Sequence, residues 1–244
     1  MSSISLEQIK KTLHTSGKYW IVFTGDSITS CEWVHPNWRE IVIYVLQREL
    51  VNLMSDDWKI PSWGVRGFNF AYDGATTKDI LNKIDDILLV KPQLVISLMG
   101  GNDPVLGVSE EESVENITKI SELVAKAGSQ LVWCGSTPAG KGSKKNPEYE
   151  PYAKALMQIP EKVNFFKIDM FNIYQNYSTE KFFTFISEGN PVEGVKAGDL
   201  DLQHPNQLGN AYIAKIILKE IFGINFDADE YIKDTLEGKK YPGY

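Results

Sequence analysis

The sequence predicts an α/β fold built around a parallel β-sheet, and three observations support this prediction. Short runs rich in β-branched and aromatic residues alternate with longer amphipathic stretches along the whole chain, as repeated βα units require. Two of the short runs, 93–99 and 130–134, are almost entirely apolar, which is typical of strands covered by helices on both faces. No linker divides the alternating pattern into halves.

Five strands and five helices follow from this pattern. The predicted strands are 19–24, 67–72, 93–99, 130–134 and 163–168. The predicted helices are 38–50, 77–89, 109–127, 149–159 and 206–222. Asn37 is a suitable N-cap for the first helix, and Gly128 ends the third. We therefore expect one domain over 1–244, with a core at about 19–222 and a polar C-terminal arm at 223–244.

The composition is that of an ordinary globular protein. Hydrophobic residues make up 43% and charged residues 23% of the 244 residues, which argues against disorder. The net charge is −7, and no basic run is longer than Lys144-Lys145. Because a polyanion needs a basic surface, we expect no nucleic-acid partner.

The cellular location is predicted from what the chain lacks. The first 20 residues hold no uninterrupted apolar core of a signal peptide, and no segment approaches the roughly 20 apolar residues of a membrane span. We therefore expect a cytoplasmic protein without a membrane span. The two cysteines, Cys31 and Cys134, have neither disulfide-framework nor metal-ligand spacing, so we expect buried thiols.

Four short segments fall at, or can reach, the carboxyl edge of the predicted sheet, where ligands bind in open parallel sheets. They are Gly25-Asp26-Ser27, the stretch 69–77 around Gly74, Gly100-Gly101-Asn102-Asp103, and the stretch 201–209 with Asp201 and His204. Glycine permits sharp turns and close approach of a ligand to the backbone. Taken alone, the first two segments are equally well explained as a turn or a helix cap, whereas the position of 100–103 after the most apolar strand makes a plain turn a poorer explanation.

The histidine spacing favours nucleophilic catalysis. Asp201 lies three residues before His204, so its carboxylate can accept a hydrogen bond from the imidazole and stabilise the imidazolium. The chain has three histidines. His14 lies in an N-terminal amphipathic segment and His35 in the loop after Ser27, so only His204 has a carboxylate at this spacing in a glycine-bounded turn.

Taken together, the four segments resemble the sequence blocks of the SGNH, or GDSL, hydrolase family. Block I is similar to Gly25-Asp26-Ser27, the block II glycine to Gly74, block III to 100–103 and block V to 201–204. All four occur in the family's order. The sequence departs in two places: Ile28 follows the serine where the family has leucine, and Ala71 stands where a second glycine is common.

The resemblance implies a flavodoxin-like three-layer α/β/α sandwich with a five-stranded parallel sheet, and a serine esterase without a metal or organic cofactor. In that mechanism Ser27 is the nucleophile, His204 the general base and Asp201 its orienting carboxylate. The oxyanion is bound by the backbone N–H groups of Ser27 and Gly74 and by the Asn102 side chain. The product of the first step is an acyl-enzyme.

The substrate-binding residues predicted from the sequence are Trp33, His35 and Asp26, in or next to the loop 28–37. Aromatic faces beside an esterase site can hold a sugar ring, which favours a short-acyl ester, with an acetylated carbohydrate as the favoured candidate. Aromatic packing beneath the loop is an equally good explanation. A thioesterase, a lysophospholipase and a non-catalytic ligand-binding protein are the alternatives. The oligomeric state is not predicted.

Overall fold

The computed structural model describes residues 4–54, 62–189, 195–238 and 241–243. Within these residues lies one five-stranded sheet, with every neighbouring pair parallel and the order β2-β1-β3-β4-β5. The strands are β1 (Tyr19–Gly25), β2 (Val65–Asn69), β3 (Leu94–Leu98), β4 (Gln130–Cys134) and β5 (Phe165–Ile168). This is the flavodoxin-like strand order, so the predicted fold class is confirmed.

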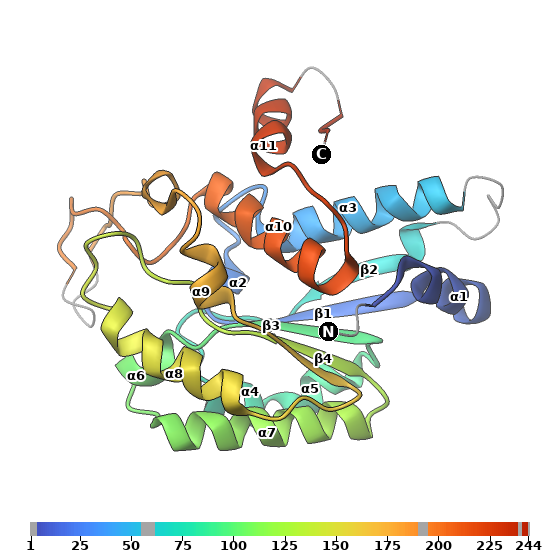
Figure 1. Cartoon of the computed structure of the whole chain (residues 1–244), viewed down its shortest axis with the longest axis horizontal. Coiled ribbons are helices and arrows are strands. Elements are labelled where there is room, and N and C mark those ends of the chain that lie inside the picture. Colours follow the sequence, from blue (N-terminus) through green and yellow to red (C-terminus); the bar gives the residue numbers. More distant parts are fainter. Residues whose placement is uncertain (1–3, 55–61, 190–194, 239–240, 244) are drawn as a thin grey trace.

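Helices cover both faces of the sheet and make the three layers visible in Figure 1. On one face lie α1 (Leu6–Ser16), α3 (Trp38–Leu53), α9 (Met170–Tyr174) and α10 (Gln207–Phe222). On the other lie α4 (Thr77–Asn82), α5 (Ile84–Leu89), α7 (Glu110–Lys126) and α8 (Asn146–Gln158). Each face has its own apolar cluster, as burial of a sheet on both sides requires.

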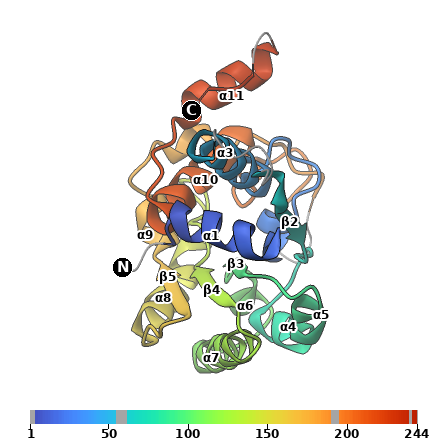
Figure 2. The ribbon, with the colours of Figure 1, turned by 90° about the vertical axis from the view of Figure 1, so that its right-hand side faces the viewer.

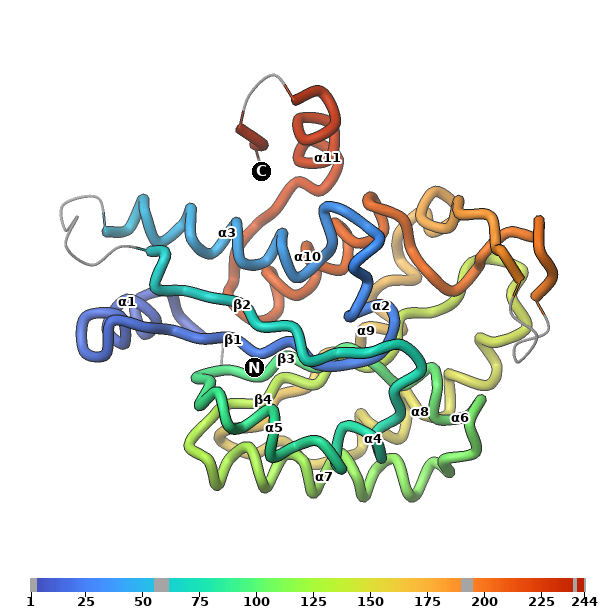
Figure 3. Tube along the Cα trace, turned by 180° about the vertical axis from the view of Figure 1, so that it is seen from behind, coloured from blue at the N-terminus to red at the C-terminus, as the bar shows by residue number. Residues whose placement is uncertain are grey.

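The predicted second strand was misplaced. It was expected at 67–72, whereas β2 is Val65–Asn69 and forms the sheet edge seen from behind in Figure 3. Gly67, expected as the first residue of the strand, is the middle residue of β2, where a Cβ would lie 2.8 Å from both Ile43 and Phe23. The strand ends where Asn69 Oδ1 accepts a hydrogen bond from the Ala71 amide and bends the chain.

The predicted helix 77–89 is two helices. α4 ends and α5 begins at Lys83, whose φ of −106° and ψ of 10° leave the helical range. The apolar side chains of Ile80, Ile84 and Ile87 stay buried across the break. The apolar spacing therefore looks continuous in the sequence although the backbone is not.

Among the described helices that were not predicted, α1 and α11 (Ala228–Glu237) lie near the two ends of the chain. α1 begins with a capping box in which the Ser5 and Gln8 side chains bond each other's backbone, and just before it the Ile4 N–H donates to Ile221 O of α10 (2.9 Å). α11 lies in the predicted C-terminal arm. It projects from the α10 side of the molecule, as Figures 1 and 2 show. No helix in the described part of the chain is long and apolar enough to cross a membrane.

The strand order places a switch point at the carboxyl edge between β1 and β3. β1 pairs with β2 on one side and with β3 on the other, so the connections from these strands leave in opposite directions and open a crevice. The short helices α2 (Ser27–Ser30) and α6 (Asn102–Val105) begin there, directly after β1 and shortly after β3. Both carry residues singled out in the sequence.

A buried amide joins α10 to α3 and to the chain just before α10. Asn210 is fully buried. Its Oδ1 accepts from the Trp38 backbone N–H at 3.2 Å, and its Nδ2 donates to Pro205 O at 2.9 Å and to Asn206 O at 3.1 Å. Because Pro205 follows His204 directly, this amide fixes where the histidine loop leaves the helix.

Replacing Asn210 by alanine should lower the free energy of unfolding by about 2–4 kcal/mol, because the buried Trp38 N–H and Pro205 O lose their partner. Urea unfolding measures the change. Asn225 is the matched control: it is exposed and accepts only from Lys219 Nζ, so Asn225→Ala should change stability by less than about 0.5 kcal/mol. Equal stability of the two variants would contradict this assignment.

Candidate active site

Ser27 lies at the carboxyl end of β1, on the first turn of α2. Gly25, with a φ of 151°, makes the turn out of the strand. Asp26 caps α2, its Oδ1 accepting from the Ile28 N–H at 3.1 Å. As the first residue of α2, Ser27 has a backbone N–H that the helix itself leaves without an acceptor. Its hydroxyl is half-buried and borders the crevice.

The structure brings Ser27, His204 and Asp201 together. Ser27 Oγ lies 2.9 Å from His204 Nε2, and His204 Nδ1 lies 2.7 Å from Asp201 Oδ2. The other carboxylate oxygen, Oδ1, accepts the backbone N–H groups of Gln203 (2.8 Å) and His204 (3.0 Å). The carboxylate thus holds both the ring and the loop that carries it.

The environment keeps Asp201 ionised. Partial burial alone would raise the pKa of its carboxyl group, but the hydrogen bond and charge of His204 and the two backbone N–H donors outweigh it and lower the pKa. An ionised carboxylate at Nδ1 stabilises an imidazolium when the ring takes a proton. The arrangement can therefore remove a proton from the Ser27 hydroxyl.

The two further candidate donors lie on neighbouring segments. Asn102 begins α6, and its Nδ2 donates to Ala75 O at 3.1 Å. An amide NH₂ has two hydrogens, so one stays available for a ligand. Gly74 directly precedes Ala75 and has a φ of 74°, a left-handed conformation that favours glycine. The Asn102 contact thus holds the Gly74 turn beside α6.

The cavity at Ser27 and His204 is small. Its volume is about 20 Å³, close to what one water molecule needs. Asn102, Thr137, Ala139 and Tyr149 are among its walls. Thr137 Oγ1 is buried, and none of the described residues offers it a hydrogen bond, which marks it as a site for water or ligand.

Trp33 packs against the imidazole of His204. Its ring meets that of His204 edge-on, with centroids 5.4 Å apart, and that of Phe185 at 5.7 Å. Half of the side chain is exposed (51%). Trp33 therefore both packs against the imidazole and presents apolar surface to solvent.

The structure does not bring His35 into this cavity. Its Nδ1 lies 3.2 Å from Glu40 Oε1 and its Nε2 lies 2.6 Å from Glu32 O, so both ring nitrogens are engaged on the exposed surface before α3. The substrate role predicted for His35 has no contact that supports it here.

Asp26 borders the cavity but is almost completely buried, with 4% of its surface exposed. Burial raises the pKa of Asp26 to about 7, although the Ile28 backbone N–H and the charge of His204 oppose the rise. A buried acid that caps the nucleophile helix is better placed to set the polarity beneath Ser27 than to touch a bulky substrate.

Sequence reasoning missed Thr137 and Tyr149. Thr137 closely follows β4, at the same carboxyl edge as the four segments that were singled out, so position in the sheet could have found it. Tyr149 lies on α8, and only the packing of that helix against the edge brings its ring to the cavity.

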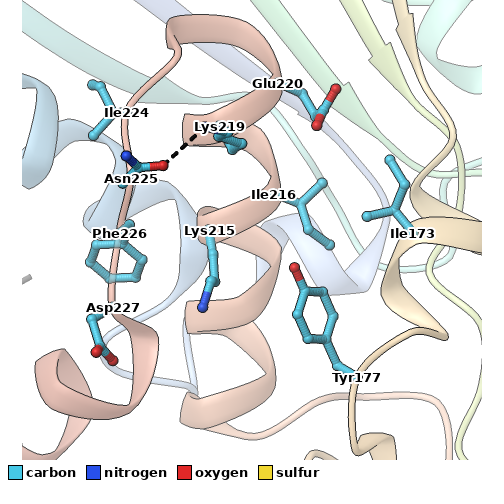
Figure 4. A pocket seen from close by; sticks show the side chains of 10 residues that line it. All are labelled: Ile173, Tyr177, Lys215, Ile216, Lys219, Glu220, Ile224, Asn225, Phe226 and Asp227. Atoms are coloured by element: carbon cyan, nitrogen blue, oxygen red, sulfur yellow. Dashed lines mark hydrogen bonds between the residues drawn. The ribbon is translucent and has the colours of Figure 1, made fainter.

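A larger cavity, of about 500 Å³, lies elsewhere (Figure 4). It is formed by α9, α10 and the chain leading to α11, with Ile216, Tyr177 and Phe226 among its walls. It contains none of Ser27, Asp201 or His204. Among the described residues, no group of three or more His, Cys, Asp or Glu side chains could hold a metal ion. Cys31 and Cys134 are free and buried, as expected.

A family model matches most of the chain. Residues 23–212 match the model of the GDSL-like lipase/acylhydrolase family. No curated protein matches the chain.

Solved structures share the fold at low sequence identity. A lipase/acylhydrolase from Enterococcus faecalis is 22% identical, with a TM-score of 0.59 over 84% of this chain and 96% of its own. An acetylxylan esterase from Geobacillus stearothermophilus, solved as a catalytic mutant, is 17% identical, with a TM-score of 0.58 over 86% and 97%. Another acetyl xylan esterase is 17% identical, with a TM-score of 0.62 over 83% and 100%.

The raised pKa of Asp26 makes stability depend on pH. The folded-state pKa of about 7 lies above the ordinary value of 3.8 for an aspartic acid, so folding favours the protonated acid, and stability should fall as the pH rises from about 4 to about 7. Asp26→Asn keeps an Oδ1 acceptor for Ile28, so it should flatten this dependence. It should also stabilise the protein at about pH 8 by up to about 4 kcal/mol. Urea unfolding at pH 5 and pH 8 tests this. If the free energy of unfolding differs between the two pH values as much in the variant as in the wild type, the prediction is refuted.

Proposed function

Because the chain belongs to the GDSL-like lipase/acylhydrolase family, a family of carboxylic ester hydrolases, we propose that it is a serine esterase that hydrolyses short-acyl esters through an acyl-enzyme. The observation that carries the proposal is the unbroken hydrogen-bonded series from Ser27 Oγ through His204 to Asp201. The proposal treats 1–244 as a single esterase domain.

The reaction begins when Ser27 Oγ attacks the ester carbonyl carbon and His204 Nε2 takes the serine proton. Asp201, held ionised, stabilises the imidazolium that results. His204 then gives the proton to the leaving alcohol, and the acyl group stays on Ser27. Water, deprotonated by His204, attacks the acyl-enzyme and releases the acid.

Negative charge on the carbonyl oxygen is stabilised by three donors from three segments: the backbone N–H groups of Ser27 and Gly74 and the second hydrogen of Asn102 Nδ2. They suit charge that appears only in the transition state, because folding positions them in advance. The bond from Asn102 to Ala75 O supports this role, since it fixes the amide next to Gly74.

The acyl group is proposed to be short, with acetyl as the best fit. The cavity at Ser27 has room for about one methyl-sized group, and Ala139 and Tyr149 are among the side chains that line it. On the alcohol side, the exposed Trp33 ring beside His204 offers a flat apolar surface of the kind that stacks on a sugar ring. Acetylxylan esterases among the structural relatives support an acetylated carbohydrate as the substrate class.

Ser27→Ala should abolish covalent labelling by an aryl organophosphonate and lower ester turnover by several orders of magnitude, because the nucleophile is gone. Labelling is followed by intact mass spectrometry and turnover with an aryl acetate. His204→Ala should be nearly as damaging. His35→Ala is the matched control: this histidine also contacts a carboxylate, Glu40, but outside the site, and its removal should leave kcat within about twofold. Labelling of Ser27→Ala at the wild-type level would refute the assignment.

A series of aryl esters from acetate to octanoate tests the acyl preference. We expect kcat/KM to fall by at least about tenfold between acetate and octanoate, since a pocket of about 20 Å³ discriminates by size. Tyr149→Ala should reduce this difference by opening the wall of the cavity. Faster hydrolysis of octanoate than of acetate by the wild type would favour a thioesterase or lysophospholipase instead.

A further inference from the structure

Hydrogen bonds on both sides of Gly74 join its turn to the segments that carry the other two proposed oxyanion donors, α2 with Ser27 and α6 with Asn102. Gly74 lies between Asp73 and Ala75. Ala75 O accepts from Asn102 Nδ2 at 3.1 Å, which joins the turn to α6. Asp73 Oδ1 accepts from Ser30 Oγ, which joins the turn to α2, the helix of Ser27.

The Ser30 side of this arrangement is built into a fixed helix end. Ser30 is the last residue of α2 and is buried, with 9% of its surface exposed. Its backbone oxygen accepts from Arg39 Nη2 at 2.8 Å and from Asn69 Nδ2 at 3.3 Å. The Ser30 hydroxyl has two acceptors, Asp73 Oδ1 and, at 3.3 Å, the Ser27 backbone oxygen of its own helix. Ser30 Oγ therefore faces the turn from a helix end that several bonds hold in place.

The Asp73 side of the contact is less firmly held, because no surrounding side chains bury it. Asp73 is exposed, and the turn's backbone bonds lie on either side of it, with Tyr72 N–H donating to Gly25 O at 3.2 Å and Ala75 N–H to Tyr72 O at 3.2 Å. The direction of the Gly74 N–H depends on the torsions on both sides of the glycine, and glycine alone restricts those torsions little. A contact to Asp73 is what limits them from the α2 side.

We propose that Ser30 and Asp73 are positioning residues for catalysis. Their hydrogen bond keeps the Gly74 N–H pointing to the place where, together with the Ser27 N–H, it donates to the oxyanion. This inference rests on the proposed esterase function. Neither residue touches the substrate in this role. The contact acts through the turn, so its loss should weaken transition-state binding more than ground-state binding.

The positioning role of the Ser30–Asp73 bond can be tested without loss of the fold. α2 is held by other bonds, since Thr29 Oγ1 donates to Leu98 O at 2.8 Å and the Arg39 guanidinium binds the Thr29 and Ser30 carbonyl groups. A hydrogen bond to an exposed side chain contributes little to global stability. Loss of the Ser30–Asp73 bond should therefore leave Ser27 in place and change mainly the turn.

The experiment compares Ser30→Ala, Asp73→Ala, Asp73→Asn and the double variant Ser30→Ala/Asp73→Ala with the wild type, using an aryl acetate. Each alanine variant should lose about tenfold in kcat with KM within about twofold. This loss is smaller than the 10²–10³ seen when a whole oxyanion donor is removed. The double variant should lose no more than Ser30→Ala alone, because Asp73→Ala breaks only a contact that Ser30→Ala also breaks, whereas Ser30→Ala additionally removes the longer contact to Ser27 O. Asp73→Asn keeps an acceptor oxygen and should retain at least about half of the wild-type kcat.

Thermal unfolding of every variant accompanies the kinetics, and an unchanged Tm assigns a loss to the site. If Ser30→Ala does not fold, the comparison of kcat between Asp73→Ala and Asp73→Asn decides the proposal. The proposal is overturned if Asp73→Ala keeps the wild-type kcat, if the two alanine losses multiply in the double variant, or if Asp73→Asn is as slow as Asp73→Ala. A wild type that neither hydrolyses the ester nor accepts the phosphonate would overturn the esterase function itself.

Discussion

The site depends on one close approach between β1 and β3. A Cβ on Gly25 would lie 2.2 Å from Leu98 O, and the φ of 151° is one that other residues rarely adopt. Because Gly25 comes this near, Thr29 Oγ1 can donate to the same carbonyl oxygen at 2.8 Å. The start of α2 and the end of β3 are thereby held as one unit, so the positions of Ser27 and Asn102 both follow from this contact.

The sequence predicted the sheet well because parallel strands covered on both faces are uniformly apolar. β3 and β4 lie within the predicted runs, and β1 extends one residue beyond its run. The sequence-based prediction of element bounds was wrong where tertiary packing overrides the local pattern. β2 begins two residues before Gly67 because Val65 and Arg66 pair with β1, and the bend at Lys83 leaves the apolar spacing intact. Neither effect has a signature within a few residues of the position concerned.

At the site, the residues predicted from short spacings are adjacent in space. Asp201 and His204 are three residues apart and close a local hydrogen bond, and Ser27 was found as the residue after a strand and a glycine. What sequence reasoning missed depends on contacts between distant segments. Ser30 meets Asp73 across 43 residues, and Asn210 meets Trp38 across 172. Such pairs are set by the register of the sheet and the docking of α10.

The separation of 177 residues between Ser27 and His204 bears on how the protein is made. A ribosome releases the N-terminal segments first, so Ser27 emerges long before the loop that carries its proposed base. That loop is joined to α10 through Asn210, which donates to Pro205 O and Asn206 O, and contacts so distant along the chain form slowly. A nascent chain therefore carries an ordinary serine hydroxyl, and hydrolytic competence arises only once the last layer of helices has closed over the sheet.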